Sequence, residues 1–220
     1  MIEGILTDTQ RAFLKSAGAH PFISRDFYLT GGTALAAFYL GHRYSEDLDF
    51  FAEKEVDILA VDIFLKEIRQ SLGITAIDFQ QSYNRNLFFL HFGDGAVLKT
   101  EFTHFPFTRI EKGLAADAIA IDSILDIAVN KLFTIYQQSR TRDYIDLYCI
   151  CTKEQFSISD LLLKAKTKFD WHIDSIQLGT QFMKAGDVKD YPRMIRTIDD
   201  VEWQEFFRGE AKKLAGDIIK

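Results

Sequence analysis

Apolar and polar residues follow two different periods along this chain, and the dominant period changes near its middle. In the first half, segments with helical spacing alternate with short strand-like runs. The expected helices cover residues 7–17, 33–40 and 56–72, and the expected strands cover residues 27–29, 48–51, 74–81, 86–92 and 96–105. The last three strands are separated only by turn sequences, so they predict an antiparallel meander. Gly41 stands where it would end the second helix.

From residue 121 onward the pattern is helical almost throughout. The expected helices cover residues 122–138, 141–151, 157–169, 173–185 and 202–220. Strands in the first half and helices in the second favour an α+β core followed by a C-terminal helical subdomain. We therefore expect two domains, 1–115 and 116–220, with the boundary inside segment 112–120.

The composition is that of a globular protein without membrane segments. The 220 residues are 47% hydrophobic, which is enough to bury a full core. No apolar run is long enough to cross a membrane and the first twenty residues lack signal-peptide features, so we expect a cytoplasmic protein that contacts no membrane. A net charge of -6 argues against a general basic face for nucleic acid, and leaves a local groove open.

Two aspartates stand one residue apart in segment 44–51, YSEDLDFF. Side chains at i and i+2 of a strand share a face, so Asp47 and Asp49 would project together while Leu48 and Phe50 point to the apolar side. Adjacent carboxylates repel each other unless a cation lies between them, and such oxygen ligands suit Mg²⁺ or Mn²⁺. The alternative interpretation is ordinary surface charge at a strand end.

A glycine pair precedes these aspartates by one short helix. Gly31 and Gly32 follow a strand and open a helix, where a close backbone approach and free N–H groups favour an anion, and Thr33 could add a hydroxyl. The alternative is a simple turn with a helix cap, and the segment is not a P-loop because the Gly-Lys-Ser/Thr ending is missing. A phosphate-binding turn beside a two-carboxylate metal site indicates transfer of a nucleotidyl or phosphoryl group.

A third carboxylate, Glu101, belongs to the strand at 96–105. On this strand one side carries Lys99, Glu101 and Thr103, and the residues between them, with Leu98, lie on the other side. Glu101 therefore lies on a polar face. Its strand is expected to pair near Asp49. Glu101 is either a further metal ligand or an ordinary exposed strand residue, and both interpretations remain open.

Two blocks of the chain resemble one known family. Segment 29–51, LTGGTALAAFYLGHRYSEDLDFF, resembles the signature of the AbiEii/AbiGii-type toxin nucleotidyltransferases, a branch of the DNA polymerase β-like nucleotidyltransferase superfamily. Segment 130–148, NKLFTIYQQSRTRDYIDLY, is similar to the downstream motif of that branch. The matching positions are Gly32, Thr33, Arg43, Ser45, Asp47 and Asp49 in the first block, and Lys131, Arg142, Asp143, Asp146 and Leu147 in the second. Arg140 departs slightly from the expected spacing.

The resemblance implies a fold, an activity and partners. The fold is a nucleotidyltransferase-like mixed or antiparallel sheet with flanking helices. The activity is transfer of a nucleotidyl group from a nucleoside triphosphate, with Mg²⁺ or Mn²⁺ as cofactor. The implied partners are a cognate antitoxin protein and, as in some members, a tRNA or other RNA acceptor.

The resemblance also implies roles for individual residues. Asp47 and Asp49 hold the metal and Glu101 assists, although the third carboxylate is often Asp in this superfamily. The nucleotide-binding set comprises Gly31, Gly32 and Thr33 at the phosphates, Arg43 and Ser45 in the loop before the metal strand, and Lys131 at the triphosphate. Asp143 joins the catalytic set by holding Lys131 or contacting the acceptor, and Asp146 is assigned to a salt-bridge network.

Two alternatives remain at this stage. The same fold can serve as a non-catalytic module that binds a nucleotide or a partner. A small-molecule phosphotransferase would use the same residues and would differ in its products, because nucleotidyl transfer releases pyrophosphate whereas phosphoryl transfer leaves a nucleoside diphosphate.

Overall fold

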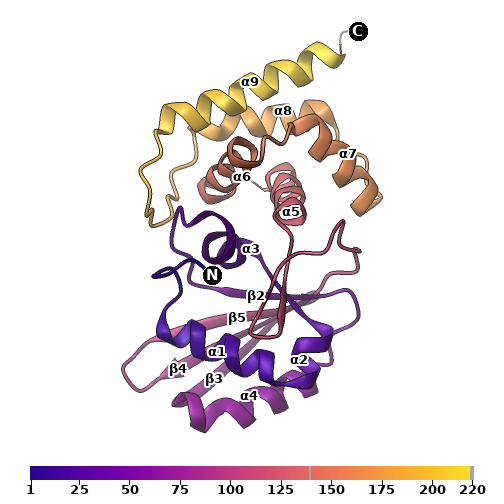
Figure 1. Cartoon of the computed structure of the whole chain (residues 1–220). Coiled ribbons are helices and arrows are strands. Elements are labelled where there is room, and N and C mark those ends of the chain that lie inside the picture. The colour runs from indigo at the N-terminus through magenta and orange to yellow at the C-terminus, as the bar shows by residue number, and fades with distance from the viewer. Residues whose placement is uncertain (139, 219–220) are drawn as a thin grey trace. The chain divides into compact units, whose positions relative to one another are not determined.

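The computed structural model describes residues 1–138 and 140–218 (Figure 1). The chain divides into two compact units, Met1–Thr108 with Lys112–Ser123, and Arg109–Glu111 with Ile124–Lys220. The first unit carries the sheet and the second is helical, as the order of sequence patterns predicts. A domain division at residue 115 stays a prediction; the short strands on either side of residue 117 both belong to the first unit.

The first unit is a mixed sheet flanked by helices. Its elements are α1 (Asp8–Ala19), α2 (Pro21–Asp26), β1 (Tyr28–Thr30), α3 (Gly31–Leu35), a π-helical turn (Ala36–Leu40), β2 (Leu48–Ala52), α4 (Ile58–Leu72), β3 (Ile74–Ser82), β4 (Arg85–Phe92), β5 (Val97–His104), β6 (Ala115–Ala116) and β7 (Ile119–Ile121). Within the described residues, seven strands form one sheet in the order β3-β4-β5-β2-β1-β7-β6. The predicted antiparallel meander is confirmed for β3, β4 and β5. Strand β2 runs parallel to β5 and antiparallel to β1, and β7 runs parallel to β1.

Local sequence signals set several of the helix ends. Helix α1 begins with a capping box in which the Thr7 side chain accepts from the Gln10 backbone and the Gln10 side chain accepts from the Thr7 backbone. Gly41 and Gly73 adopt the left-handed conformation at the ends of the π-helical turn and of α4. The helix expected over 33–40 therefore begins two residues earlier and is π-helical in its second half.

Aromatic rings form the core on one face of the sheet. Helices α1, α2 and α4 cover this face, whereas α3 lies on the other (Figure 1). Phe13 of α1 and Phe64 of α4 pack in an edge-on contact with ring centroids 5.8 Å apart, and Phe50 stacks on Phe102 at 5.1 Å. All four rings are fully buried, and each such burial stabilises the fold by about 2 kcal/mol. The opposite face of β2 and β5 carries mostly polar residues.

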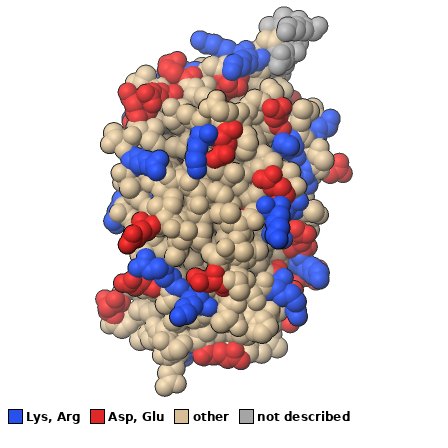
Figure 2. All heavy atoms as spheres, viewed as in Figure 1, with Lys and Arg blue, Asp and Glu red and all other residues tan. Residues whose placement is uncertain are grey.

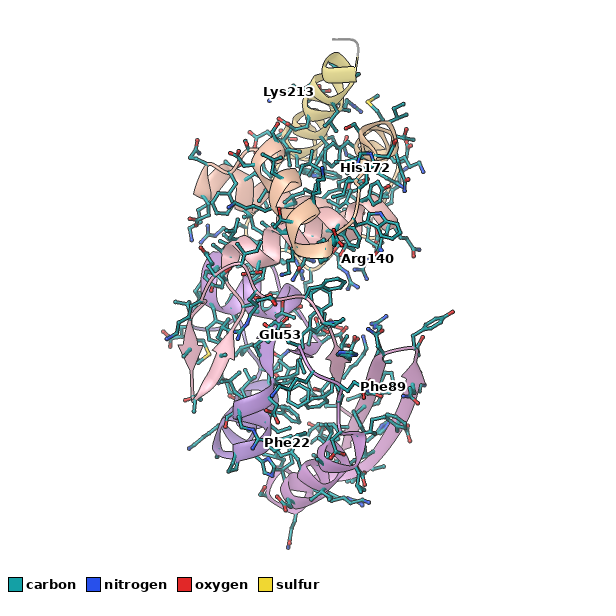
Figure 3. All side chains as sticks on the ribbon, turned by 90° about the vertical axis from the view of Figure 1, so that its right-hand side faces the viewer. Phe22, Glu53, Phe89, Arg140, His172 and Lys213 are labelled. Atoms are coloured by element: carbon teal, nitrogen blue, oxygen red, sulfur yellow. The ribbon has the colours of Figure 1, made fainter. Side chains whose placement is uncertain are left out.

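The second unit is built from helices α5 (Ile124–Gln137), α6 (Thr141–Glu154), α7 (Ile158–Phe169), α8 (Ser175–Met183), a 3₁₀ turn (Lys184–Gly186) and α9 (Asp200–Ile218). Tyr144 of α6 packs against Trp203 and Phe207 of α9, and Phe182 of α8 contacts Phe207. The end expected for the last helix, residues 219–220, lies outside the described residues. Side chains fill the interior of this unit, and Arg140 stands just before α6 (Figure 3).

Surface charge and helix hydropathy can both be read from the described part of the chain. On the face shown in Figure 2, Lys and Arg side chains are interspersed with Asp and Glu and do not gather into one basic stretch. No helix in the described part of the chain is both long and apolar enough to cross a membrane.

Three short elements were not expected from the sequence: α2, β6 and β7. Each is six residues or fewer, too short for a periodic pattern to appear. Strand β7 nevertheless matters for the sheet, because it pairs with β1 and brings Asp122 beside Thr30, whose hydroxyl donates to the Asp122 carboxylate at 2.7 Å.

Candidate active site

The register of β2 and β5 brings carboxylates together on the polar face of the sheet. Asp49 is the direct partner of Glu101 across this parallel pair, so the expected pairing of their strands is confirmed. Leu48 and Phe50 are fully buried while Asp47 and Asp49 are partly exposed, which is the alternation expected of a half-buried strand. Asp47 and Asp49 therefore share the polar face with Glu101.

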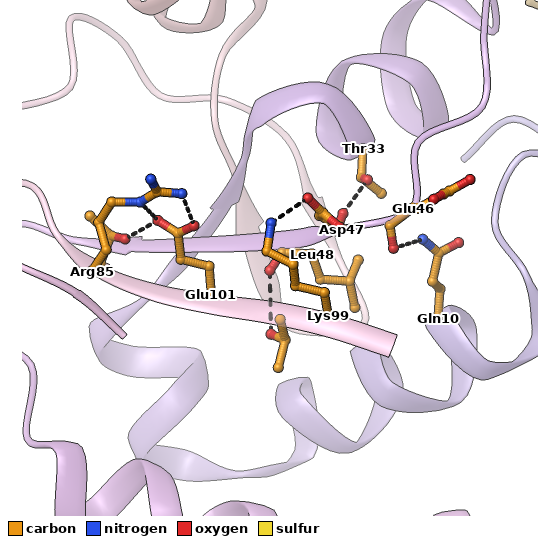
Figure 4. Close-up of polar contacts among 10 residues, drawn as sticks. Gln10, Thr33, Glu46, Asp47, Leu48, Arg85, Lys99 and Glu101 are labelled. Carbon is orange, nitrogen blue, oxygen red and sulfur yellow. Dashed lines mark hydrogen bonds and ion pairs between the residues drawn. The ribbon is translucent and has the colours of Figure 1, made fainter. Parts of the chain in front are cut away.

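Asp47 is held through both its side chain and its backbone (Figure 4). Lys99 Nζ lies 2.7 Å from Asp47 Oδ2. The Thr33 hydroxyl donates to the backbone carbonyl of Asp47. The Gln10 side-chain amide donates to the preceding carbonyls of Ser45 and Glu46 at 3.0 and 3.1 Å. Helix α1 and the glycine turn thus fix the segment that enters β2.

The glycine pair lies directly against the residues of the DxD segment. Gly31 has a φ of +73°, and a Cβ at this position would overlap the carboxylate of Asp49. A Cβ at Gly32 would overlap the guanidinium of Arg43 and would approach Ser45 Oγ to 3.0 Å. The turn needs glycine at both positions because these side chains occupy the space that a Cβ would take.

These contacts bring most of the predicted nucleotide-binding residues to one place. The members in the first unit are Gly31, Gly32, Thr33, Arg43 and Ser45, and they lie beside the predicted metal ligands Asp47 and Asp49 at the start of α3 and in the segment that leads into β2. The Arg43 side chain is buried, and one of its amino groups donates to the Tyr44 carbonyl at 2.9 Å.

Two side chains donate hydrogen bonds to Glu101, and these contacts were not predicted from the sequence. Arg85 of β4 makes a two-pronged contact, with Nε 2.7 Å from Oε1 and Nη2 2.5 Å from Oε2, and the Thr103 hydroxyl donates to Oε1 at 2.5 Å. Burial alone would raise the pKa of the Glu101 carboxyl, but the hydrogen bonds from Arg85 and Thr103 outweigh burial and hold this pKa below its ordinary value. Glu101 is therefore an anion already paired with a cation.

The donor set suits a magnesium-like ion at Asp47 and Asp49. Mg²⁺ in proteins is commonly held by one or two carboxylates together with water and substrate phosphates. Among the described residues, no three His, Cys, Asp or Glu side chains are gathered as a ready metal-binding group. The two aspartates fit such an ion, while the predicted role of Glu101 as a ligand stays a prediction, because ligation would require its contact with Arg85 to open.

A second charged cluster lies in the helical unit and contains the other predicted residues. Lys131 Nζ of α5 is 2.7 Å from Asp143 Oδ1 and 2.7 Å from Asp146 Oδ2 of α6. Arg140 Nε is 2.8 Å from Asp143 Oδ2. The i,i+3 spacing does place both carboxylates at Lys131, as expected from the helix period.

Comparisons with known proteins agree with this architecture. The family described as Nucleotidyl transferase AbiEii toxin, Type IV TA system, matches residues 12–214. An uncharacterized protein of Aquifex aeolicus is 28% identical over 200 residues, which make up 87% of this chain and 89% of that protein.

Two solved structures share the fold. A candidate nucleotidyltransferase from H. pylori aligns with a TM-score of 0.63 at 20% identity, over 99% of this chain and 97% of that one. JHP933 from Helicobacter pylori aligns with a TM-score of 0.60 at 20% identity, over 95% of this chain and 90% of that one. The expected nucleotidyltransferase-like α+β fold is confirmed, and because the family match spans most of the chain, this protein belongs to the AbiEii family of nucleotidyltransferase toxins.

Proposed function

We propose that this nucleotidyltransferase moves a nucleotidyl group from a nucleoside triphosphate to a hydroxyl of an RNA acceptor, such as a tRNA, with Mg²⁺ or Mn²⁺ held by Asp47 and Asp49. The observation that supports this proposal most directly is the contact of the Asp49 carboxylate with Gly31. It puts a metal-binding side chain against a turn whose backbone can approach a polyphosphate.

In the proposed reaction the acceptor oxygen attacks the α-phosphorus, the bond from this phosphorus to the bridging oxygen breaks, and pyrophosphate leaves. The bound ion would neutralise charge on the triphosphate and on the attacking oxygen. Asp47 and Asp49 supply the carboxylate oxygens for it. The backbone of Gly31 and Gly32 receives the phosphates, and Arg43 and Ser45 support the turn from behind. The hydroxyl proton passes to a nearby carboxylate or to water.

The contacts of Thr33 and Lys131 refine their proposed roles. The Thr33 hydroxyl is used by the Asp47 carbonyl, so we propose that Thr33 contributes by tying the glycine turn to β2. A lysine ammonium has three N–H donors, and Asp143 and Asp146 take two of them at Lys131. A contact of Lys131 with the triphosphate is part of the proposal, and Asp143 would orient the lysine for it.

The experiment that tests the proposal is a labelled transfer reaction. Purified protein is incubated with Mg²⁺, total RNA and each of the four α-labelled nucleoside triphosphates in turn. Asp49→Ala removes a proposed metal ligand, and Asp62→Ala is the matched control, because Asp62 is a partly exposed carboxylate of α4 that pairs with Lys66. We expect label in a discrete RNA with the wild type and with Asp62→Ala, and none with Asp49→Ala.

The products separate this proposal from its alternatives. A nucleoside diphosphate in place of pyrophosphate, with a γ-labelled small molecule, would indicate a phosphotransferase. Calorimetry that detects no binding of Mg²⁺ and triphosphates would indicate a module that binds a partner only.

We also propose that the protein acts as the toxin of a pair with a cognate antitoxin, in line with its family. Expression of the wild-type chain alone is then expected to slow the growth of a bacterial host, and expression of Asp49→Ala is not. Equal growth of both strains at equal protein levels would contradict this role.

A further inference from the structure

The pair formed by Arg85 and Glu101 is more than an exposed salt bridge. Glu101 is 3% exposed and accepts three hydrogen bonds, so both of its oxygens are in use. Thr103, which supplies the third bond, is the direct partner of Arg85 across β4 and β5. A carboxylate held at both oxygens fixes the plane of the guanidinium that it binds.

Arg85 nevertheless keeps donors for another ligand. Its side chain is 51% exposed, and an arginine carries five N–H donors in a planar fork. Glu101 engages Nε and Nη2, while Nη1 makes no hydrogen bond within the described part of the chain. The guanidinium is therefore anchored on one edge and accessible on another.

The position of Arg85 connects it to the metal-binding aspartates. Its partner Glu101 is the neighbour of Asp49 across β2 and β5. The pKa of Arg85 is raised, first by the hydrogen bond to Glu101 and in smaller part by the charges of Asp49 and Asp47. Arg85 thus lies within the electrostatic field of both aspartates. Once a divalent ion offsets their charge, Arg85 adds positive charge for a polyanion.

We infer that Arg85 binds phosphate oxygens of the triphosphate, and that Glu101 is a positioning residue that holds Arg85 in place rather than a third ligand of the metal. The inference rests on the proposed function, because it assumes a triphosphate at Asp47 and Asp49. A planar guanidinium matches phosphate oxygens with two parallel hydrogen bonds, which a lysine does not. If Glu101 turned to a metal ion instead, the Arg85 cation would lose its counter-charge beside a second cation.

Two probes separate the metal from the phosphates in calorimetry on the full-length protein. Mn²⁺ alone reports the carboxylate site, and inorganic tripolyphosphate with saturating Mg²⁺ reports phosphate binding without requiring the preferred base. The variants are Arg85→Met, Arg85→Lys, Glu101→Gln and the double variant of Arg85→Met with Glu101→Gln. Arg25→Met is the matched control, because Arg25 is also an exposed arginine of the first unit paired with a carboxylate, that of Asp26.

We expect Arg85→Met to weaken tripolyphosphate binding roughly tenfold or more, since it removes charge-assisted hydrogen bonds. Arg85→Lys is expected to recover only part of this loss. The control Arg25→Met is expected to bind tripolyphosphate like the wild type. Mn²⁺ affinity should stay within about twofold of the wild type in Glu101→Gln, since ligand loss would cost on the order of tenfold. In the double variant residue 101 carries no charge, so no buried carboxylate lacks a partner. We therefore expect the double variant to fold.

The decisive measurement is the coupling between the two residues. Glu101→Gln should weaken tripolyphosphate binding in the wild-type background and should have no further effect once Arg85 is Met. A large loss of Mn²⁺ affinity in Glu101→Gln would instead make Glu101 a metal ligand and overturn the inference. Normal tripolyphosphate binding by Arg85→Met would overturn it as well.

Failure of the proposed function gives a different result. Wild-type protein that binds neither Mn²⁺ nor tripolyphosphate would overturn the proposed function, and this inference with it. Wild-type protein that binds both probes, with Arg85 variants unchanged, would overturn this inference alone.

Discussion

The two charged clusters use the same residue types in opposite ways. On the sheet of the first unit, Asp47 is 31% exposed and its partner Lys99 is 27% exposed. In the helical unit, the side chains of Asp143 and Asp146 are 1% and 0% exposed, and that of Lys131 is 10% exposed. The carboxylate of the first cluster is open to solvent and ligands, whereas the two carboxylates of the second are buried within a helix pair.

The difference in burial decides what each cluster contributes. A partly exposed ion pair is worth about 0–1 kcal/mol, so Lys99 can release Asp47 to a metal ion at little cost. Removing one partner of a buried cluster leaves uncompensated charge and costs about 3–5 kcal/mol. The comparison teaches that the sheet cluster is suited to exchange partners and the helical cluster to keep them, and substitutions in the two clusters should separate activity from stability.

The largest expected effect is on activity, from Asp47→Asn. Loss of a proposed metal ligand should lower the rate of nucleotidyl transfer roughly 10³-fold, in the range seen when one electrostatic group is removed from an active site. The free energy of unfolding should change by less than about 1 kcal/mol, because the pair with Lys99 is partly exposed. Rates come from labelled RNA and stabilities from urea unfolding.

Asp8→Asn is the control for this change, because Asp8 is an exposed aspartate paired with Arg11 in the same unit. It should leave both rate and stability unchanged. If Asp47→Asn unfolded the protein instead, the distinction between the two clusters would be lost.

The second effect is on stability, from Lys131→Met. This change removes the cation shared by two buried carboxylates and, although Asp143 keeps its pair with Arg140, should destabilise the protein by about 3–5 kcal/mol. Lys213→Met is matched to it, since Lys213 pairs with Glu210 at the surface of the same unit, and should cost less than about 0.5 kcal/mol. Urea unfolding measures both.

Neutralising the carboxylates should restore much of the lost stability. Lys131→Met combined with Asp143→Asn and Asp146→Asn leaves no buried charge in excess, so we expect the triple variant to be more stable than Lys131→Met alone. An unchanged or lower stability would mean that packing, and not charge, sets the cost.

The sequence predicted those parts of the fold that have either a long segment of regular hydrophobic spacing or a local turn or cap signal. Helix α4 shows fifteen residues of helical spacing between an Asp57 cap and Gly73, and the meander of β3 to β5 follows from two turn sequences. Strand β7 has three residues, and its pairing with β1 depends on a contact across some ninety residues of chain. No local pattern encodes such a pairing.

The candidate site divides along the same line. Asp47, Asp49 and the glycine pair are close in sequence and share a short motif, so their meeting was predictable. Arg85 was missed, because its contact with Glu101 depends on the register of β4 against β5. The available signal was weak: an arginine in the turn directly before the strand expected at 86–92, which was expected to pair with a strand carrying Lys99, Glu101 and Thr103 on its polar face.

A third substitution sharpens the comparison within the first unit, because two glycines there have the same backbone but different surroundings. Gly31 and Gly73 have φ of +73° and +71°. Alanine at either position should cost about 1–2 kcal/mol of stability from the left-handed backbone. A Cβ at Gly73 meets no atom within 4 Å, whereas a Cβ at Gly31 would displace the Asp49 carboxylate. Only Gly31→Ala should therefore lose Mn²⁺ affinity in calorimetry, and equal losses in both variants would place the metal elsewhere.

The smallest expected effect is the pH dependence that Glu101 gives to stability. The pKa of its carboxyl is below the ordinary value in the folded protein, despite burial, because of the hydrogen bonds from Arg85 and Thr103. A group with a lowered folded-state pKa binds fewer protons when folded, so its stabilisation is present above the unfolded-state pKa and is lost as pH falls through the folded-state pKa. Because Arg85 is half exposed, we expect only about 1 kcal/mol from this term.

Comparison with Glu101→Gln isolates this contribution from the other carboxylates, which titrate in both proteins. The wild type should be the more stable of the two at pH 7, and urea unfolding should show the difference shrinking as the pH falls below about 4.5, where the carboxyl of the unfolded chain takes up its proton. The same pH series in the Arg85→Met background should show a smaller difference at pH 7, because the cation that lowers the pKa of Glu101 is gone. A difference that grew toward low pH would mean that burial raises the pKa of Glu101 more than the hydrogen bond from Arg85 lowers it. Glu101 would then be destabilised as an anion and could not serve to hold Arg85 in place.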